Sequence, residues 1–290
     1  MSTSRQEYYV PENSHWPIVG AVAIFTLFTG FSLWMNGASV GPVFTALGFA
    51  LLVFLFHGWF SNVIDESLSG KYSEQVDTSF RQGMVFFILS EVFFFIAFFG
   101  VLFYIRNIAL PWLNGEGHLG SSHLLWPNFV YEWPLLNLPD ASDFTPAKEA
   151  MGALGLPLYN TIILLTSGVT LTWAHHALKH GNQRNLFIGL AMTVGLGVVF
   201  LGLQAYEYYH AYAVMDLTLA SGAYGSTFYM LTGFHGFHVA MGTLMLFIIL
   251  IRSSKGHFTP EKHFAFEGVA WYWHFVDVVW LGLYLFVYWM

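Results

Sequence analysis

The chain lacks cysteine and has few charged residues. None of its 290 residues is a cysteine, and only 9% are Asp, Glu, Lys or Arg. The missing cysteine excludes disulfides, thiolate metal sites, iron–sulfur ligation and thiol catalysis within this chain. Soluble domains carry about 25% charged residues, so this chain cannot cover its surface for water. Because 56% of the residues are hydrophobic and 19% are aromatic, the composition predicts a polytopic membrane protein.

Signals of other classes are also missing. No phosphate-binding loop, nucleophile elbow or hydrolase motif occurs, and no basic stripe indicates nucleic-acid binding. The first fifteen residues contain one arginine, two glutamates and no apolar core, so they resemble neither a secretory signal nor a transit peptide. We therefore expect the first spanning helix to serve as its own insertion signal.

Apolar runs of spanning length occur seven times. A helix needs about 20 residues to cross a hydrocarbon core of about 30 Å. The sequence therefore predicts an all-α fold with seven transmembrane helices, near residues 16–35, 43–60, 83–105, 158–178, 186–206, 227–250 and 268–289.

The lysines and arginines predict the orientation. If the N-terminus lies inside, only Arg106 and Lys148 lie on the outer side. Loops on the inner side of a membrane are enriched in Lys and Arg, so this arrangement favours an inner N-terminus and an outer C-terminus. The inner side then holds Arg5, Lys71, Arg81, Lys179, Arg184, Arg252, Lys255 and Lys262.

A polar stretch separates the first two predicted helices from the other five. We expect an N-terminal tail and two-helix bundle over 1–61, a cytoplasmic connection over 62–82, and a five-helix bundle over 83–290. The long outer loop 107–156 is rich in Pro, Gly, Asn and Trp, which predicts an irregular cap with one short helix near 145–154.

One acid lies deep in the third predicted helix. Its sequence from residue 81 to 100 is RQGMVFFILSEVFFFIAFFG, and Glu91 is the only charged residue between 83 and 105. Such an acid costs at least ~2.5–3.5 kcal/mol, so it should face protein, water or a bound polar group. It could relay protons, anchor a lipid headgroup or partner helix, or hydrogen-bond within the bundle. His238 has a comparable depth on an oppositely directed helix, and we predict that the two are neighbours.

Several of the thirteen histidines are also at membrane depth. His235 and His238 share a helix face, so they could ligate haem or copper, or they could hydrogen-bond to neighbouring helices. His274 and Asp277 are three residues apart, which predicts a mutual or interhelical hydrogen bond. Glu207 and Glu267 are near predicted helix ends, and we expect both to organise loops rather than catalyse a reaction.

Five stretches together resemble subunit III of the haem–copper cytochrome c oxidases. Their order and spacing match that family, and the resemblance extends over almost the whole chain. The stretches are RQGMVFFILSEVFFF (81–95), LTSGVTLTWAHHAL (165–178), LQAYEYY (203–209), YGSTFYMLTGFHGFHVAMGT (224–243) and HFAFEGVAWYWHFVDVVWLGLYLFVYW (263–289).

The resemblance implies both an architecture and a role. The family's seven helices are divided two plus five by a V-shaped cleft that holds phospholipids. The family serves as a core subunit of a proton-translocating oxidase, in which subunits I and II carry haem and copper and reduce O₂ with electrons from cytochrome c. Subunit III itself carries no redox centre, cofactor or metal, and supports proton uptake, oxygen access and lasting activity of subunit I. On this basis His235, His274 and Asp277 are structural.

The resemblance also assigns residues to the lipid cleft. Glu91, with its expected neighbour His238, matches the family's cleft acid, while Trp59 and Glu66 match residues that flank the lipid headgroups. Arg81 matches a basic residue that could pair with a phosphate, although it could equally be a positive-inside anchor. The family usually has two arginines shortly after Trp59, and this chain lacks both, which weakens the expectation of the same lipid or affinity.

Other hypotheses remain open. The chain could be the equivalent subunit of a quinol oxidase, but those forms usually lack the first two helices. It could instead be an independent proton-coupled transporter built on Glu91 and the histidines, or a haem-ligating catalytic subunit with its own visible absorption. The long outer loop favours a bacterial plasma membrane over a mitochondrial inner membrane.

Overall fold

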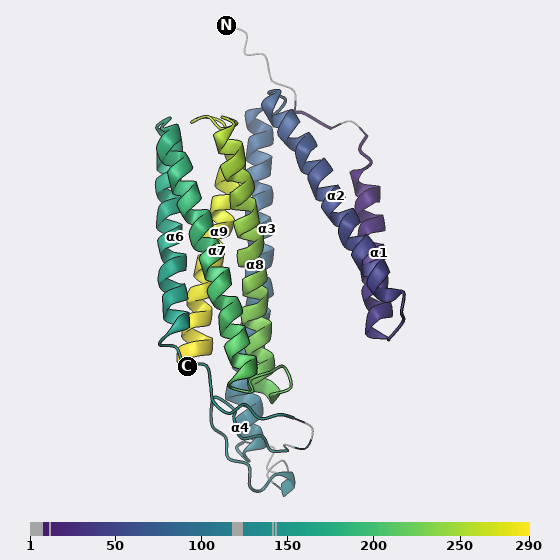
Figure 1. The fold of residues 1–290 in the computed structure, drawn as a ribbon, viewed down its shortest axis with the longest axis vertical. Helices are drawn as coiled ribbons and strands as arrows, with labels where there is room; N and C mark the ends of the chain where they lie inside the picture. The colour runs from purple at the N-terminus through teal and green to yellow at the C-terminus, as the bar shows by residue number, and fades with distance from the viewer. Residues whose placement is uncertain (1–7, 12, 118–123, 141, 143) are drawn as a thin grey trace. The chain divides into compact units, whose positions relative to one another are not determined.

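All regular structure in the described part of the chain is helical. The computed structural model describes residues 8–11, 13–117, 124–140, 142 and 144–290, and Figure 1 shows its long helices. This confirms the predicted all-α class and its seven long helices. They are α1 (Trp16–Met35), α2 (Gly41–Leu68), α3 (Glu74–Tyr104), α6 (Leu156–Lys179), α7 (Gln183–Ala213), α8 (Gly222–Ser254) and α9 (Phe264–Leu283).

Six of these helices are long and apolar enough to cross a membrane. α3 continues through the π-helix η1 (Ile105–Ala109) into α4 (Leu110–Leu113), and α9 continues into η2 (Tyr284–Trp289). Among the described helices of this length, α6 is the exception, because it is rich in serine and threonine. Those hydroxyls bond within the helix, for example from Thr161 to the carbonyl of Pro157 at 2.8 Å, and this reduces the cost of their burial.

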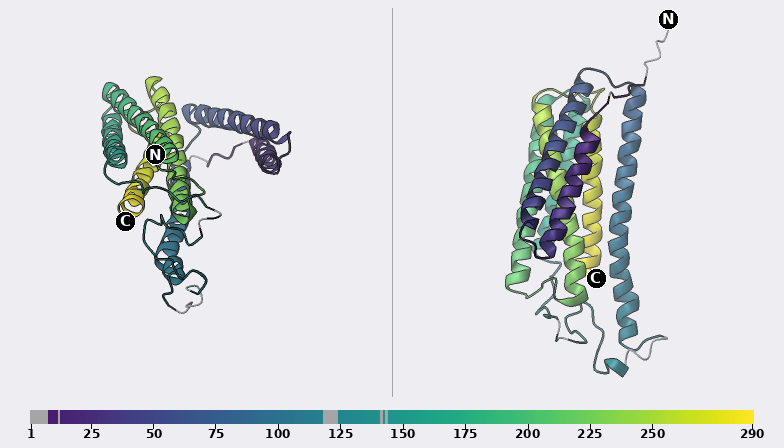
Figure 2. Two further views of the ribbon diagram at one scale, coloured as in Figure 1. Left: turned by 60° about the horizontal axis from the view of Figure 1, so that its bottom comes forward. Right: turned by 90° about the vertical axis from the view of Figure 1, so that its right-hand side faces the viewer.

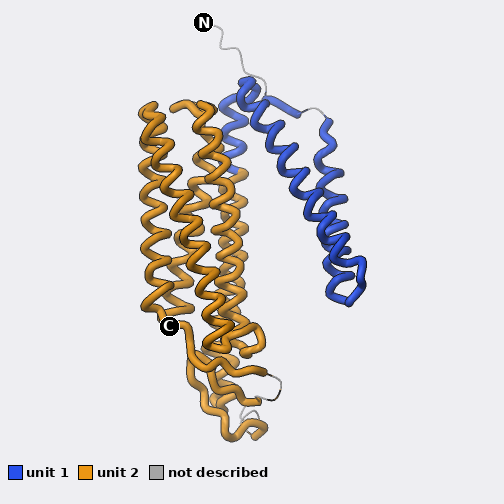
Figure 3. The backbone as a smooth tube through the Cα atoms, viewed as in Figure 1, with its two compact units in different colours: residues 1–82 blue, residues 83–290 orange. Residues whose placement is uncertain are grey.

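The chain forms two compact units, residues 1–82 and 83–290, which Figure 3 colours separately. The first contains the α1–α2 hairpin. A Cβ added at Gly30 or Gly48 would collide with the backbone of the facing helix, so both positions need glycine. Small residues of this kind allow the close backbone approach that holds helices together where no hydrophobic drive exists between them.

The second unit is a bundle in which α7 packs on α6 and α8, and α9 packs on α6 and α8. These helices run side by side in every view (Figures 1 and 2). From Gly83 onward α3 joins this unit through its rings, since Phe94 contacts Phe234 and Phe95 contacts Phe275. The largest fully buried side chains of the unit are Trp273, Trp280, Tyr224, Phe200, Phe228 and Phe266.

The short helix predicted near 145–154 is not present. The amide of Thr145 donates to the carbonyl of Ala220 at 3.0 Å, and that of Lys148 donates to Met215 at 2.8 Å. These two bonds attach the stretch to the α7–α8 connection, and no helical turn forms over 145–154. The prediction of a short helix here is wrong.

Candidate functional site

The deep acid and its predicted neighbour meet inside the bundle. Glu91 Oε2 of α3 lies 2.9 Å from His238 Nε2 of α8. The side chain of His238 is 8% exposed and that of Glu91 is 22% exposed. The predicted proximity, which was based on comparable depth in two oppositely directed helices, is confirmed.

The second ring nitrogen of His238 fixes the proton arrangement. Nδ1 lies 2.6 Å from the carbonyl oxygen of Phe234, which can only accept, so Nδ1 carries a hydrogen. One proton then lies between Nε2 and the Glu91 carboxylate. The pair is either a neutral imidazole with a carboxylic acid or an imidazolium with a carboxylate. Both forms have no net charge, and the proton can move between the two atoms without creating an isolated charge at membrane depth.

Aromatic rings surround this pair. The ring of Phe95 meets that of His238 edge-on at 4.9 Å, and Tyr272 stacks with it at 6.3 Å. The ring of Phe94 lies 6.0 Å from the same ring. Such surroundings have a low dielectric constant, which strengthens the Glu91–His238 hydrogen bond and raises the cost of removing either partner.

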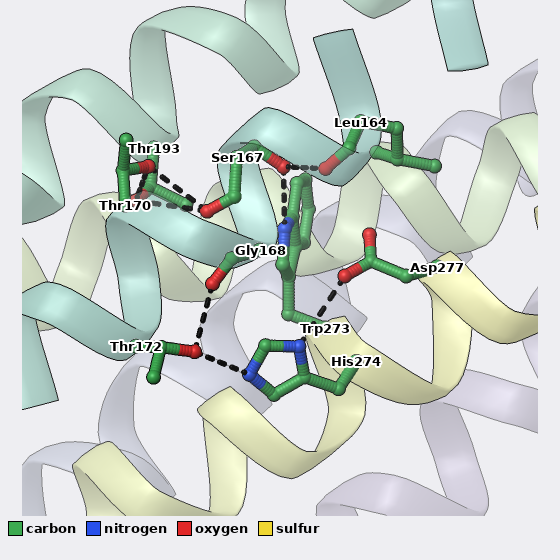
Figure 4. A network of polar contacts seen from close by, with 9 residues as sticks. All are labelled: Leu164, Ser167, Gly168, Thr170, Thr172, Thr193, Trp273, His274 and Asp277. Atoms are coloured by element: carbon green, nitrogen blue, oxygen red, sulfur yellow. Dashed lines mark hydrogen bonds and ion pairs between the residues drawn. The ribbon is translucent and has the colours of Figure 1, made fainter. Parts of the chain in front are cut away.

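His274 and Asp277 belong to a separate polar network between α6 and α9, shown in Figure 4. Nδ1 of His274 lies 3.3 Å from Asp277 Oδ2, and its Nε2 lies 3.5 Å from the hydroxyl of Thr172, a weaker contact. The indole of Trp273 donates to Ser167 at 2.9 Å. The predicted mutual and interhelical contacts are therefore both present, and the network joins the two helices.

His235 has a different environment from His238. It is 1% exposed, and its ring lies 5.1 Å from that of Trp280 and 5.9 Å from that of Phe200. Neither of its nitrogens forms a hydrogen bond with the described residues. The two histidines share a helix face but have different partners, so the structure does not bring them together as a pair of ligands.

Glu207 lies inside a helix and not at a helix end as predicted. It is fully buried within α7, which continues to Ala213, so the prediction that it organises a loop at a helix end is wrong. Tyr288 donates to its Oε1 at 2.7 Å and Gln204 donates to the same atom at 3.3 Å. The spacing of Gln204 and Glu207 puts both on one helix face and could have indicated this buried contact.

In the unit formed by residues 1–82, Glu66 is held by protein side chains. Tyr9 donates to its Oε1 at 3.0 Å, and Tyr72 donates to its Oε2 at 2.7 Å. Burial and the neighbouring Glu66 carboxylate raise the pKa of Tyr72, so its hydroxyl remains a donor. Trp59, in contrast, is 46% exposed.

Arg81 pairs with an acid on its own helix. Its Nε lies 2.7 Å from Asp77 Oδ2, one turn earlier on α3. Both side chains are partly exposed, and exposed pairs of this spacing contribute only about 0.3–0.5 kcal/mol.

Comparison with known proteins identifies the family. The family model described as cytochrome c oxidase subunit III matches residues 6–116 and 142–290, leaving out part of the outer loop. Relatives named cytochrome c oxidase subunit 3 occur in Formosania lacustris (40% identity), Latimeria chalumnae (39%) and Xenopus laevis (40%). Each alignment covers 100% of this chain and 99% of the relative. This chain therefore belongs to the cytochrome c oxidase subunit III family.

Proposed function

We propose that this chain is a core subunit of a terminal oxidase and carries no redox centre itself. It assembles with subunits I and II, which hold the haem and copper, and it supports proton uptake, oxygen access and lasting turnover there. Its family membership supports the assignment to an oxidase complex. The Glu91–His238 pair is the observation that best supports a role in proton handling, because the pair can hold a proton at membrane depth without net charge.

The proposed electron donor is cytochrome c. The relatives are all named as cytochrome c oxidase subunits, and α1 and α2 are present, which favours this donor over a quinol. An independent proton-coupled transporter would remain folded and active when purified alone. We expect this chain instead to co-purify with chains that contain haem.

The proposed location is the mitochondrial inner membrane, with the N-terminus on the inner side. The reported relatives come from vertebrates and favour this location. They give no support to the bacterial plasma membrane that the long outer loop had suggested. The chain is in either case a multi-pass membrane protein.

Phospholipid is the proposed ligand near the outward face of α3. Phe86 and Phe93 are 69% and 62% exposed, and their rings offer an apolar surface suited to acyl chains. In the unit formed by residues 1–82, Trp59 and Arg81 are each proposed, independently of those rings, to contact the interfacial part of a lipid, Trp59 through its exposed indole and Arg81 through its guanidinium. Since Glu66 is already bonded to two tyrosines, we expect it to position the chain around the headgroup rather than bind it directly.

Replacing Glu91 by Gln tests the proton role. An amide can still hydrogen-bond to His238, but it cannot share the proton, and the neutral bond has roughly half the strength. We expect an assembled oxidase with unchanged haem content that inactivates after fewer turnovers. Glu149→Gln is the matched control, because Glu149 is an exposed acid of the outer loop. Loss of haem from the Glu91 variant, or equal turnover in both variants, would contradict the proposal.

Glu91→Lys tests the environment of the same position. A lysine would bring a second cationic or donor group to His238, at a depth where a charge costs about 2.5–3.5 kcal/mol. We expect the amount of assembled chain in membranes to fall sharply, while Glu149→Lys leaves it unchanged. Immunoblots of the membrane fraction measure both, and normal accumulation of the Glu91 variant would show that the site tolerates a cation.

A further inference from the structure

A cavity lies between the start of α7 and the end of α8. Its volume is about 580 Å³, and its walls include Arg184, Phe187 and Ile188 from α7 and Ser253 and Ser254 from α8. Both segments are helix ends, and α7 packs against α8. Figure 1 shows that these two ends lie at the end of the bundle away from α4, which is the end predicted to lie on the inner side of the membrane.

The cavity has a polar end and an apolar end at different membrane depths. Arg184 is in the first turn of α7 and is exposed. Phe187 and Ile188 follow one turn later, about 5 Å further along the helix and on the same face. They are 45% and 37% exposed. The apolar run of α7 begins near residue 186, so Arg184 is at the level of lipid headgroups and the two apolar side chains are where acyl chains begin.

The apolar end continues along α8. Ile251 and Phe247 precede Ser254 by three and seven residues, so all three lie on one face of the helix. Ile251 is 40% exposed, Phe247 is 48% exposed, and Ile248 is 44% exposed. These three apolar side chains form an α8 strip of about two turns that leads from the cavity towards the middle of the membrane. An acyl chain can lie along this strip, whereas a free anion makes no favourable contact with it.

The two helix ends around the cavity are basic. Residues 179–188 and 250–258 contain Lys179, Arg184, Arg252 and Lys255 and no Asp or Glu. Arg184 is the only charged residue among the described residues that line the cavity. The first turn of a helix also attracts anions, because its backbone N–H groups are available as donors and the helix dipole is positive there. The polar end of the cavity therefore suits an anionic group.

We propose that this cavity binds an anionic phospholipid, whose phosphate pairs with Arg184 and whose acyl chains lie along Phe187, Ile188 and the α8 strip. Guanidinium and phosphate are well matched, since two parallel N–H···O bonds form between them. Ser253 adds a hydroxyl donor to the polar wall. A zwitterionic lipid would instead bring its own cation to this basic end of the bundle. The site is on α7 and α8 and is separate from the lipid proposed near α3.

The test uses the assembled oxidase that contains the full chain. It is reconstituted in phosphatidylcholine vesicles with a fraction of phosphatidylglycerol that carries a photoreactive group on one acyl chain. After illumination, mass spectrometry measures the labelling of residues 185–192 and 244–251. We expect labelling to fall about fivefold in Arg184→Gln, the factor that one basic residue near a membrane surface contributes to binding of anionic lipid. Lys179→Gln is the matched control. It removes an exposed charge from the same end of the bundle, but Lys179 does not line the cavity, so this variant should be labelled like the wild type.

Two comparisons distinguish this lipid from other ligands. Photoreactive phosphatidylcholine should label the wild type less than phosphatidylglycerol does, and Arg184→Gln should remove the difference. Excess inorganic phosphate should leave the labelling by phosphatidylglycerol unchanged. The proposal would be overturned by equal labelling of the wild type and Arg184→Gln, by equal labelling with the two lipids, or by loss of labelling in phosphate.

The comparison of the two lipids in the wild type needs no variant, and it decides alone if Arg184→Gln does not assemble. Labelling of α3 is measured in the same samples, so the lipid proposed there is judged separately.

Discussion

The helices of the α1–α2 hairpin and those of the α6–α9 bundle are held together in different ways. In the most apolar stretches of α1 and α2, 11% of the residues are buried, compared with 44% in α9. The hairpin is held by a narrow glycine seam, a line of close helix–helix contact where Gly30 and Gly48 allow the backbone of the facing helix to approach. The bundle is held by large rings such as Trp273, whose polar atoms are paired.

This difference shows what apolar composition measures in a membrane protein. α1 and α2 are apolar around their whole circumference because most of each surface faces outward. α6 is packed against α7 and α9 and buries Asn160, Thr161 and Ser167. Because of these polar side chains, α6 has a lower mean hydropathy than the other six long helices that the structure describes. A helix that buries polar side chains against its neighbours can therefore be less hydrophobic than one whose surface is mostly exposed.

The largest expected effect comes from truncating Trp273. Its side chain is fully buried and donates to Ser167, so Trp273→Ala should cost about 3–5 kcal/mol through cavity formation and the loss of that hydrogen bond. Trp59→Ala, in the hairpin, should cost under about 0.5 kcal/mol, since the ring is 46% exposed. The temperature at which the subunit leaves the purified oxidase measures both. If both substitutions lowered this temperature equally, the bundle and the hairpin would not differ in how much they depend on buried rings.

A smaller effect is expected from Gly168→Ala. The new Cβ would lie 2.6 Å from Asp277 Oδ2 in the α6–α9 network, and overpacking of this kind costs typically about 1–3 kcal/mol. Gly195→Ala is the control, because a Cβ there would meet nothing within 4 Å apart from the neighbouring backbone of its own helix. The control should be neutral or should stabilise α7 by up to about 1 kcal/mol, as expected for glycine replacement inside a helix. The melting temperature of the purified complex measures both effects. Equal shifts for the two substitutions would contradict the close contact between Gly168 and Asp277.

The sequence predicted the features that depend on one helix at a time. It placed α1 over residues 16–35, as observed, and it paired Glu91 with His238 because helical rise converts residue number into depth. Helix ends were less predictable. α7 and α8 extend beyond their apolar runs, since backbone hydrogen bonds continue into the interface, and this is why Glu207 is inside a helix.

Contacts between distant segments could not be predicted in the same way. The non-helical stretch 145–154 is determined by carbonyls of the α7–α8 connection, about 70 residues away in the chain. His263 and Glu267 are spaced for one helix face, which the sequence does indicate. Nothing in it shows that α6 brings His175 to the same point. Bundle packing decides such clusters, and it depends on side-chain shapes rather than on periodicity.

The smallest effect should come from Tyr72, whose hydroxyl donates to Glu66 at 2.7 Å in the unit formed by residues 1–82. Burial and that carboxylate raise its pKa above the ordinary value of 10.0. The folded state therefore favours the protonated hydroxyl. Its contribution is fully present below pH 10 and is lost as the pH rises through the higher folded pKa.

Tyr72→Phe should accordingly cost about 1 kcal/mol near neutral pH, since one hydrogen bond to Glu66 is lost while Tyr9 keeps the other. Hydrogen exchange of the peptide over residues 62–73 measures this as faster local opening. Tyr8→Phe is the control, because Tyr8 is 47% exposed. In an alkaline titration, the wild type should develop more tyrosinate absorbance than Tyr72→Phe, and this difference should develop only above pH 10. A difference that develops below pH 10 would mean that Glu66 does not hold this hydroxyl, and the hairpin would then depend on its glycine seam alone.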